Sequence, residues 1–70
     1  MKLLYDFETD SLYIDLNSRP GSDAVEVADG LVVDFDEAGN VVGIDIEHAS
    51  LLLDLKTLET EGLPLQATGA

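Results

Sequence analysis

Hydrophobic and polar residues alternate along the chain up to about residue 47, after which the hydrophobic spacing becomes helical. Alternation with a period of two predicts strands, because successive side chains of a strand point to opposite faces of a sheet. Five segments have this pattern: residues 3–5, 11–16, 24–28, 31–36 and 41–47. The pattern therefore predicts about five short strands joined by polar turns.

The hairpin around Gly30 shows how the register of the predicted strands can be chosen. A two-residue turn at Asp29 and Gly30 would place Glu26 opposite Val33, and a carboxylate would then share a face with a valine. A three-residue loop with Gly30 in the left-handed region pairs Val25 with Val33 instead. The second register keeps the apolar side chains on one face, so it is the one we expect.

The other two hairpins, with four-residue loops at residues 7–10 and 37–40, give registers that agree with this choice. Together the three loops predict one continuous apolar face. The predicted cross-strand pairs are Leu3 with Ile14, Tyr5 with Leu12, Val25 with Val33, Val27 with Leu31, Leu31 with Ile46, Val33 with Ile44, and Phe35 with Val42.

A helix is predicted from about residue 51 to residue 61. Ser50 is a suitable N-cap, and Gly62 stands where a left-handed residue commonly ends a helix. Four leucines fall on one stripe of this helix and are expected to pack on the sheet. They are Leu51, Leu52, Leu55 and Leu58.

These elements predict an α+β fold, an antiparallel β-meander with one C-terminal helix packed on one face. A chain of 70 residues makes a single domain, which we place at residues 1–65, followed by a frayed tail at residues 66–70. The predicted core is the apolar sheet face: Leu3, Tyr5, Leu12, Ile14, Leu16, Val25, Val27, Leu31, Val33, Phe35, Val42, Ile44 and Ile46.

The chain is strongly acidic, with 3 basic and 15 acidic residues and a formal net charge of −12. Such a field repels phosphate groups, so we expect no binding to nucleic acid or to anionic membranes. The chain has no cysteine, which removes disulfides and thiolate metal sites. No apolar run is long enough to span a bilayer. We therefore expect a cytoplasmic protein.

The register places six carboxylates on the sheet face opposite the apolar one. This acidic face has three possible interpretations: a solvated surface that confers solubility, a docking surface for a small basic protein, or a site for a divalent cation. The six residues are Asp15, Glu26, Asp34, Asp36, Asp45 and Glu47.

Catalysis and metal binding have little support in the residues. The segment at residues 34–39 resembles the start of a calcium loop, but Ala38 supplies no side-chain oxygen, so a hairpin turn is the better interpretation. His48 is the only histidine, and no serine stands in a motif that would activate it. We expect no enzymatic activity, no cofactor and no metal ligands.

Three large apolar residues fall outside the predicted core, namely Leu4, Tyr13 and Leu53. Leu4 and Tyr13 should face each other on the outer side of the first hairpin, and Leu53 should project away from the helix stripe. A domain of this size buries little surface on its own, so these residues are candidate contacts with a second copy.

Several segments resemble the family catalogued as domain of unknown function 2283. They are Tyr5-Asp6, TDSLYI (9–14), EVADGLVVD (26–34), GNVVGIDI (39–46) and Ala49-Ser50. Family members more often carry glutamate where this chain has Asp45, and proline where it has Phe7. The resemblance implies a β-meander with a helix and no assigned activity. Some members look like partners encoded beside small toxin-like proteins.

The sequence thus favours a non-enzymatic protein-interaction module that forms homo-oligomers. One alternative is an antitoxin-like inhibitor whose acidic face covers a basic partner, which would bind quickly and with strong salt dependence. The other alternative is a divalent-cation-binding domain.

Overall fold

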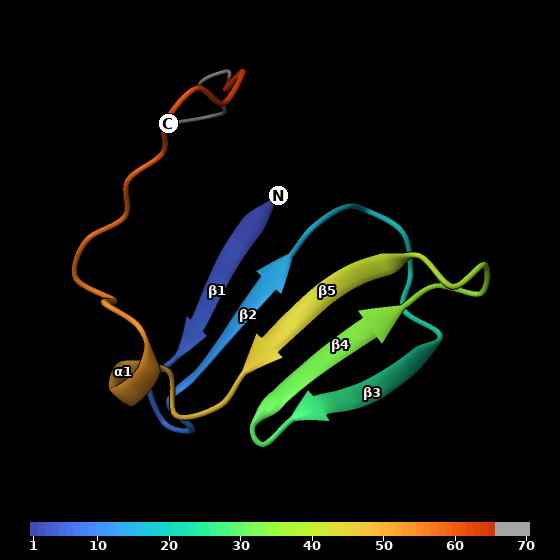
Figure 1. The fold of residues 1–70 in the computed structure, drawn as a ribbon, viewed down its shortest axis with the longest axis horizontal. Helices are drawn as coiled ribbons and strands as arrows, with labels where there is room; N and C mark the ends of the chain where they lie inside the picture. Colours follow the sequence, from blue (N-terminus) through green and yellow to red (C-terminus); the bar gives the residue numbers. More distant parts are fainter. Residues whose placement is uncertain (66–70) are drawn as a thin grey trace.

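The computed structural model describes residues 1–65, so the predicted frayed tail at residues 66–70 lies outside the described residues. Five strands and one short helix follow one another along the chain (Figure 1). Their bounds are β1 Lys2–Asp6, β2 Ser11–Asp15, β3 Asp23–Ala28, β4 Leu31–Phe35, β5 Val41–Ile46 and α1 Ala49–Leu52. The five predicted strands are confirmed to within two residues at each end.

All five strands form one antiparallel sheet with the order β1-β2-β5-β4-β3. The predicted β-meander is therefore wrong, because β2 pairs with β5 instead of β3. The loop after β2 carries the chain past the ends of β5 and β4 to the far edge of the sheet (Figure 1). Leu16 N–H donates to Val42 O at 3.0 Å, and Ser22 N–H donates to the carbonyl of Phe35 at 2.7 Å. These bonds hold the two ends of the crossing loop.

Most of the predicted registers are confirmed. Gly30 has the expected left-handed conformation, with φ of 76°. Two pairs differ because of bulges: Leu31 lies opposite Ala28, which leaves Val27 in a bulge, and Phe35 lies opposite Val41. The confirmed pairs are Leu3 with Ile14, Tyr5 with Leu12, Val25 with Val33, Val33 with Ile44, and Leu31 with Ile46.

The predicted long helix is wrong. Helix α1 has only 4 residues, its N-cap is His48 with φ of 54°, and the chain becomes extended at Leu53. Ser50 lies within α1 and does not cap it. A helix of about 11 residues is marginal in water unless an apolar partner covers its stripe. The fold is accordingly mostly β, and no helix within residues 1–65 is long and apolar enough to cross a bilayer.

The described chain has very little buried core. Val42 and Ala49 are its only buried hydrophobic residues, with 3% and 0% of their surfaces exposed. Gly21 in the crossing loop comes close to Val42, since a Cβ on Gly21 would lie 3.9 Å from Val42 Cγ2. The rest of the predicted core is half-buried or exposed, because no second layer covers the sheet.

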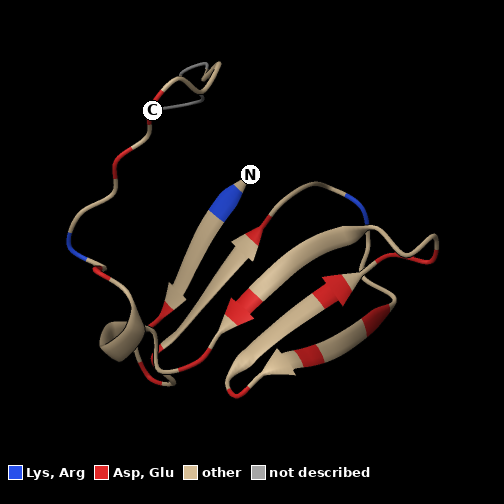
Figure 2. Ribbon diagram, viewed as in Figure 1, with Lys and Arg blue, Asp and Glu red and all other residues tan. Residues whose placement is uncertain are grey.

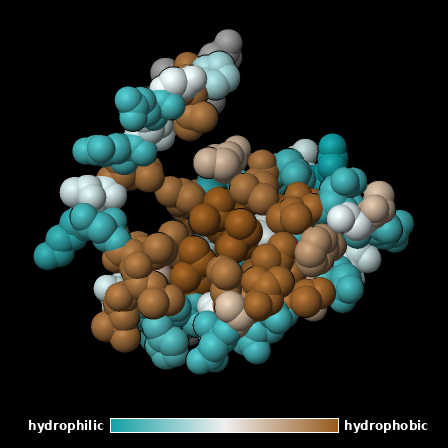
Figure 3. All heavy atoms as spheres, in the orientation of Figure 1, coloured by the Kyte–Doolittle hydropathy of each residue, from teal (hydrophilic) through white to brown (hydrophobic). Residues whose placement is uncertain are grey.

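We call the uncovered side the apolar face. Two rows of side chains run across all five strands on this side, and the space-filling view shows a broad hydrophobic surface over the sheet (Figure 3). One row is Leu3, Ile14, Ile44, Val33 and Val25. The other row is Tyr5, Leu12, Ile46, Leu31 and Ala28.

Candidate functional site

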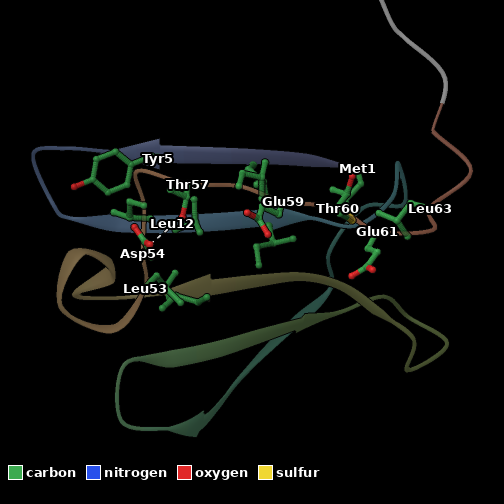
Figure 4. A pocket seen from close by; sticks show the side chains of 15 residues that line it. Met1, Tyr5, Leu12, Leu53, Asp54, Thr57, Glu59, Thr60, Glu61 and Leu63 are labelled. Carbon is green, nitrogen blue, oxygen red and sulfur yellow. Dashed lines mark hydrogen bonds between the residues drawn. The ribbon is translucent and has the colours of Figure 1, made fainter.

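A groove of about 900 Å³ lies between the apolar face and the extended segment at residues 53–63, which runs beside β1 (Figures 1 and 4). The sheet lines this groove with side chains from β1, β2 and β5: Leu3, Tyr5, Leu12, Ile14 and Ile46. The segment contributes four leucines to the groove. It also contributes three carboxylates, those of Asp54, Glu59 and Glu61. The groove is thus apolar on the sheet side and partly acidic on the segment side.

The opposite side of the sheet carries part of the predicted acidic face. Asp15 and Asp34 flank Gly43 in one row across β2, β5 and β4, and Asp45 lies beside Tyr13 in the next row. These three carboxylates therefore surround one tyrosine at the centre of the sheet. Figure 2 shows acidic positions on strands and turns, with basic ones confined to the N-terminus, the crossing loop and the C-terminal segment.

The structure does not bring all six predicted carboxylates together. Glu26 lies on the same face but on the edge strand β3. Asp36 belongs to the β4–β5 turn, and Glu47 follows β5, where its N–H donates to Gly30 O at 2.8 Å. The acidic face is thus a central group of three residues with Glu26 at the side.

Tyr13 lies across Gly43 on this face, because a Cβ at Gly43 would overlap the Tyr13 hydroxyl. The hydroxyl donates to Asp34 Oδ2 at 2.9 Å. This hydrogen bond raises the pKa of Tyr13, and burial and the negative charges of Asp34, Asp15 and Asp45 raise it further. Tyr13 was predicted to contact a second copy, and the structure shows its hydroxyl engaged within its own chain.

Replacing Gly43 by alanine is expected to push Tyr13 out and break its bond to Asp34. A side chain forced into an occupied space typically lowers the free energy of unfolding by about 1–3 kcal/mol. Urea denaturation measures the change. In a Tyr13→Ala background, Gly43→Ala should cost less than half as much, because the obstructing ring is gone. An equal cost in both backgrounds would contradict the contact.

The three predicted self-association residues do not share one surface. Leu4 and Tyr13 are direct cross-strand neighbours on the acidic side, as predicted. Leu53 lines the groove on the apolar side, since the helix that would have turned it outward does not form. Leu4 and Tyr13 therefore lie on one side of the sheet and Leu53 on the other.

The segment that resembles a calcium loop is a hairpin turn organised by Asp36. Its Oδ1 accepts the N–H groups of Ala38 and Asn40, each at 2.9 Å, and Arg19 Nη1 lies 3.7 Å from its Oδ2. The N–H of Asn40 is the main reason that the pKa of Asp36 is lowered. Within the described residues, no three histidines or carboxylates lie close enough to hold a metal ion.

Asp10 joins the β1–β2 turn to the start of α1, a role that the sequence analysis missed. It has a φ of 54°. Its carboxylate accepts the hydroxyls of Tyr5 and Ser50, each at 2.7 Å, and the Ser50 N–H at 3.1 Å. Ala49 N–H donates to the Asp10 carbonyl at 2.9 Å. We call this group of four residues the Asp10 clamp.

Hydrogen bonding changes the titration of two groups in the clamp. The Ser50 hydroxyl, followed by the Tyr5 hydroxyl, holds the pKa of Asp10 below its ordinary value of 3.8. The hydrogen bond to Asp10 in turn raises the pKa of Tyr5. The clamp therefore favours an ionised Asp10 and a protonated Tyr5. The only sequence signal for it was an aspartate in a turn, a position where aspartate tolerates positive φ.

Comparison with known proteins supports the predicted resemblance. The chain is similar to an uncharacterized protein, MJ0789, of Methanocaldococcus jannaschii, with 36% identity over 55 residues. These residues make up 79% of this chain and 47% of the relative, so the chain spans about half the length of that protein. No solved structure matches the chain.

A family model for proteins of unknown function matches residues 2–50. The match includes all five strands and the Asp10 clamp, and it ends before the leucine-rich segment at residues 51–65. The sheet described above is therefore the part that this chain shares with the family. The chain belongs to the DUF2283 family, whose function is unknown.

Proposed function

We propose that this chain is a non-enzymatic protein-interaction module that self-associates, and that it does so through the apolar face. The observation that carries the proposal is the face itself: two rows of apolar side chains span five strands, and within residues 1–65 no second layer covers them. A sheet with one hydrophobic face must bury that face against another element. In residues 1–65, α1 is too short to serve as that element.

The exposed area supports the same proposal. A compact protein of 7.5 kDa exposes about 4200 Å² on average, whereas this chain exposes 5705 Å². The excess of about 1500 Å² is larger than the roughly 800 Å² that each partner buries in a standard interface. An excess of this size supports burial of part of the surface against a partner.

The distribution of charge favours a second copy as the partner. None of the ten side chains that define the apolar face is charged, and the central carboxylates point to the other side. When two copies meet through their apolar faces, their outer faces are turned away from each other. Stacking on the apolar face therefore keeps the acidic faces of two copies apart, and apolar interfaces are typical of homodimers.

Two adjacent valines on β4 provide the test. Val33 lies on the apolar face between Ile44 and Val25, whereas Val32 lies on the acidic side between Asp45 and Glu26. Threonine has nearly the shape of valine but adds a hydroxyl, which costs about 1–3 kcal/mol when buried without a partner. Since a dimer buries two copies, Val33→Thr should weaken it by at least about tenfold.

Sedimentation equilibrium over a range of concentrations gives the dimer dissociation constant. Val32→Thr is the matched control, and we expect it to leave that constant unchanged. If both substitutions changed the dimer dissociation constant equally, the apolar face would not be the interface. A larger effect of Val32→Thr would instead place the contact on the side of Leu4 and Tyr13.

The central carboxylates favour a second candidate function, an antitoxin-like inhibitor of a small basic protein. Asp15, Asp34 and Asp45 lie on neighbouring strands and leave the apolar face free. Binding through these residues should weaken sharply with salt, whereas apolar self-association should not. Native mass spectrometry of the protein isolated from its own host would reveal a stoichiometric basic partner. Release of that partner by salt would support this function.

A further inference from the structure

The leucine-rich C-terminal segment is not fully used by its own sheet. Residues 51–65 contain seven leucines. Leu53 and Leu55, which line the groove, are 37% and 38% exposed, while the other five are all more than half exposed. A single copy thus gives partial cover to only two of these side chains.

The segment also has a hydrophobic period that its conformation does not use. Leu51, Leu55 and Leu58 fall on one stripe of a helix together with Leu52. The chain leaves the helix at Leu53 and turns at residues 55–56, so the stripe does not continue beyond α1. Gly62 nevertheless has a φ of 73°, the left-handed conformation that follows the last turn of many helices.

We propose that residues 50–61 fold into a helix when two copies associate, and that the leucine stripe of each helix packs into the groove of the second copy. This inference rests on the self-association proposed above and names the segment that completes it. The occupant of the groove is the C-terminal segment of the partner.

The size of the groove fits such an occupant. The groove holds about 900 Å³ while the chain's own segment forms one of its walls, and the sheet side, which stays in place when the segment folds, is apolar. A helix of about 11 residues is about 16 Å long, close to the roughly 17 Å of a five-residue strand. The helix can therefore lie along the strands over nearly their whole length.

Charge supports a partner that carries the same segment. Asp54, Glu59 and Glu61 line the groove, and Lys56 is one of only 3 basic residues in the chain. In a twofold arrangement each segment meets the other in reverse direction. Lys56 of each copy can then lie near the carboxylates of the other copy.

The test uses the full chain and two substitutions at one position. Circular dichroism at 222 nm and sedimentation are measured over the same concentration range. Helical signal should rise in step with dimer formation. Proline inside a helix removes a hydrogen bond and clashes with the preceding turn, so Glu59→Pro should weaken the dimer by about tenfold or more and abolish the rise. Glu59→Ala removes the same charge but favours a helix, so it should weaken the dimer by much less than Glu59→Pro and keep the rise.

Each other result overturns the inference in a distinguishable way. A dimer that forms without a gain of helix and tolerates Glu59→Pro would leave self-association standing and remove the segment from it. Helical signal that does not depend on concentration would mean that the segment folds on its own sheet. Absence of any dimer in the unmodified chain would defeat the proposed function itself.

Discussion

Replacing Ile44 by aspartate is expected to abolish self-association and to leave much of the protein unfolded at micromolar concentration. Ile44 stands at the centre of the apolar face, on β5 between Ile14 and Val33. A carboxylate there would lose its hydration in the dimer without gaining a partner, and a twofold interface would contain two such groups. A loss of several kcal/mol is comparable with the roughly 4–10 kcal/mol that stabilises a domain of this length.

Sedimentation and circular dichroism on the same samples separate loss of the dimer from loss of the fold. Ile44→Thr is the milder variant, which we expect to give a folded monomer because it keeps the branched shape at Cβ. Asp45→Asn, one residue along on the acidic side, should change neither the fold nor the dimer. A native dimer in Ile44→Asp would show that the apolar face stays exposed in the assembly.

The faces of this sheet could be predicted from the sequence because register is a local property. Gly30 fixed one hairpin, and the alternation of valine with acidic residues allowed only one choice of face. The bulge at Val27 could not be predicted, since an extra residue in one strand leaves the apolar pattern on either side intact.

Strand order and the helix depended on contacts far apart in the sequence. A hairpin pattern indicates that two strands joined by a short loop pair with each other. It does not indicate that β2 pairs with β5. Either partner would give β2 the same apolar and acidic faces. The prediction of a long helix was wrong for a related reason. The leucine stripe and the flanking residues Ser50 and Gly62 favour a helix, yet a helix of that length depends on an apolar partner.

The candidate sites likewise combine features that could be predicted from the sequence with features that could not. The carboxylates of Asp15, Asp34 and Asp45 were placed on one side by alternation alone, and the structure confirms that placement. The Asp10 clamp could not be predicted from the sequence, because it joins a turn to residues about 40 positions further along the chain. No period in the sequence links Asp10 with Ser50.

Acid is expected to weaken the fold through Asp10. The pKa of this carboxyl is below its ordinary value of 3.8 because it accepts hydrogen bonds, first from Ser50 and then from Tyr5. The folded protein therefore binds this proton less readily than the unfolded chain. The resulting stability is fully present above the unfolded pKa and is lost as the pH falls through the lower pKa of the folded state. Asp36, whose pKa is also lowered, acts in the same direction.

Replacing Asp10 by asparagine tests this role, because asparagine keeps an oxygen that can accept hydrogen bonds but cannot ionise. The variant should be less stable than the unmodified chain near pH 7, and its stability should decline less between about pH 5 and about pH 2. Urea denaturation at each pH gives both results. Glu37→Gln, in the exposed β4–β5 turn, is the control and should follow the unmodified chain. Amide exchange locates the effect: the N–H of Ser50 should exchange at least about tenfold faster in Asp10→Asn, since it bonds to the Asp10 carboxylate. Unchanged exchange at this amide would mean that α1 is held by the packing of Ala49 and by the bond from its N–H to the Asp10 carbonyl.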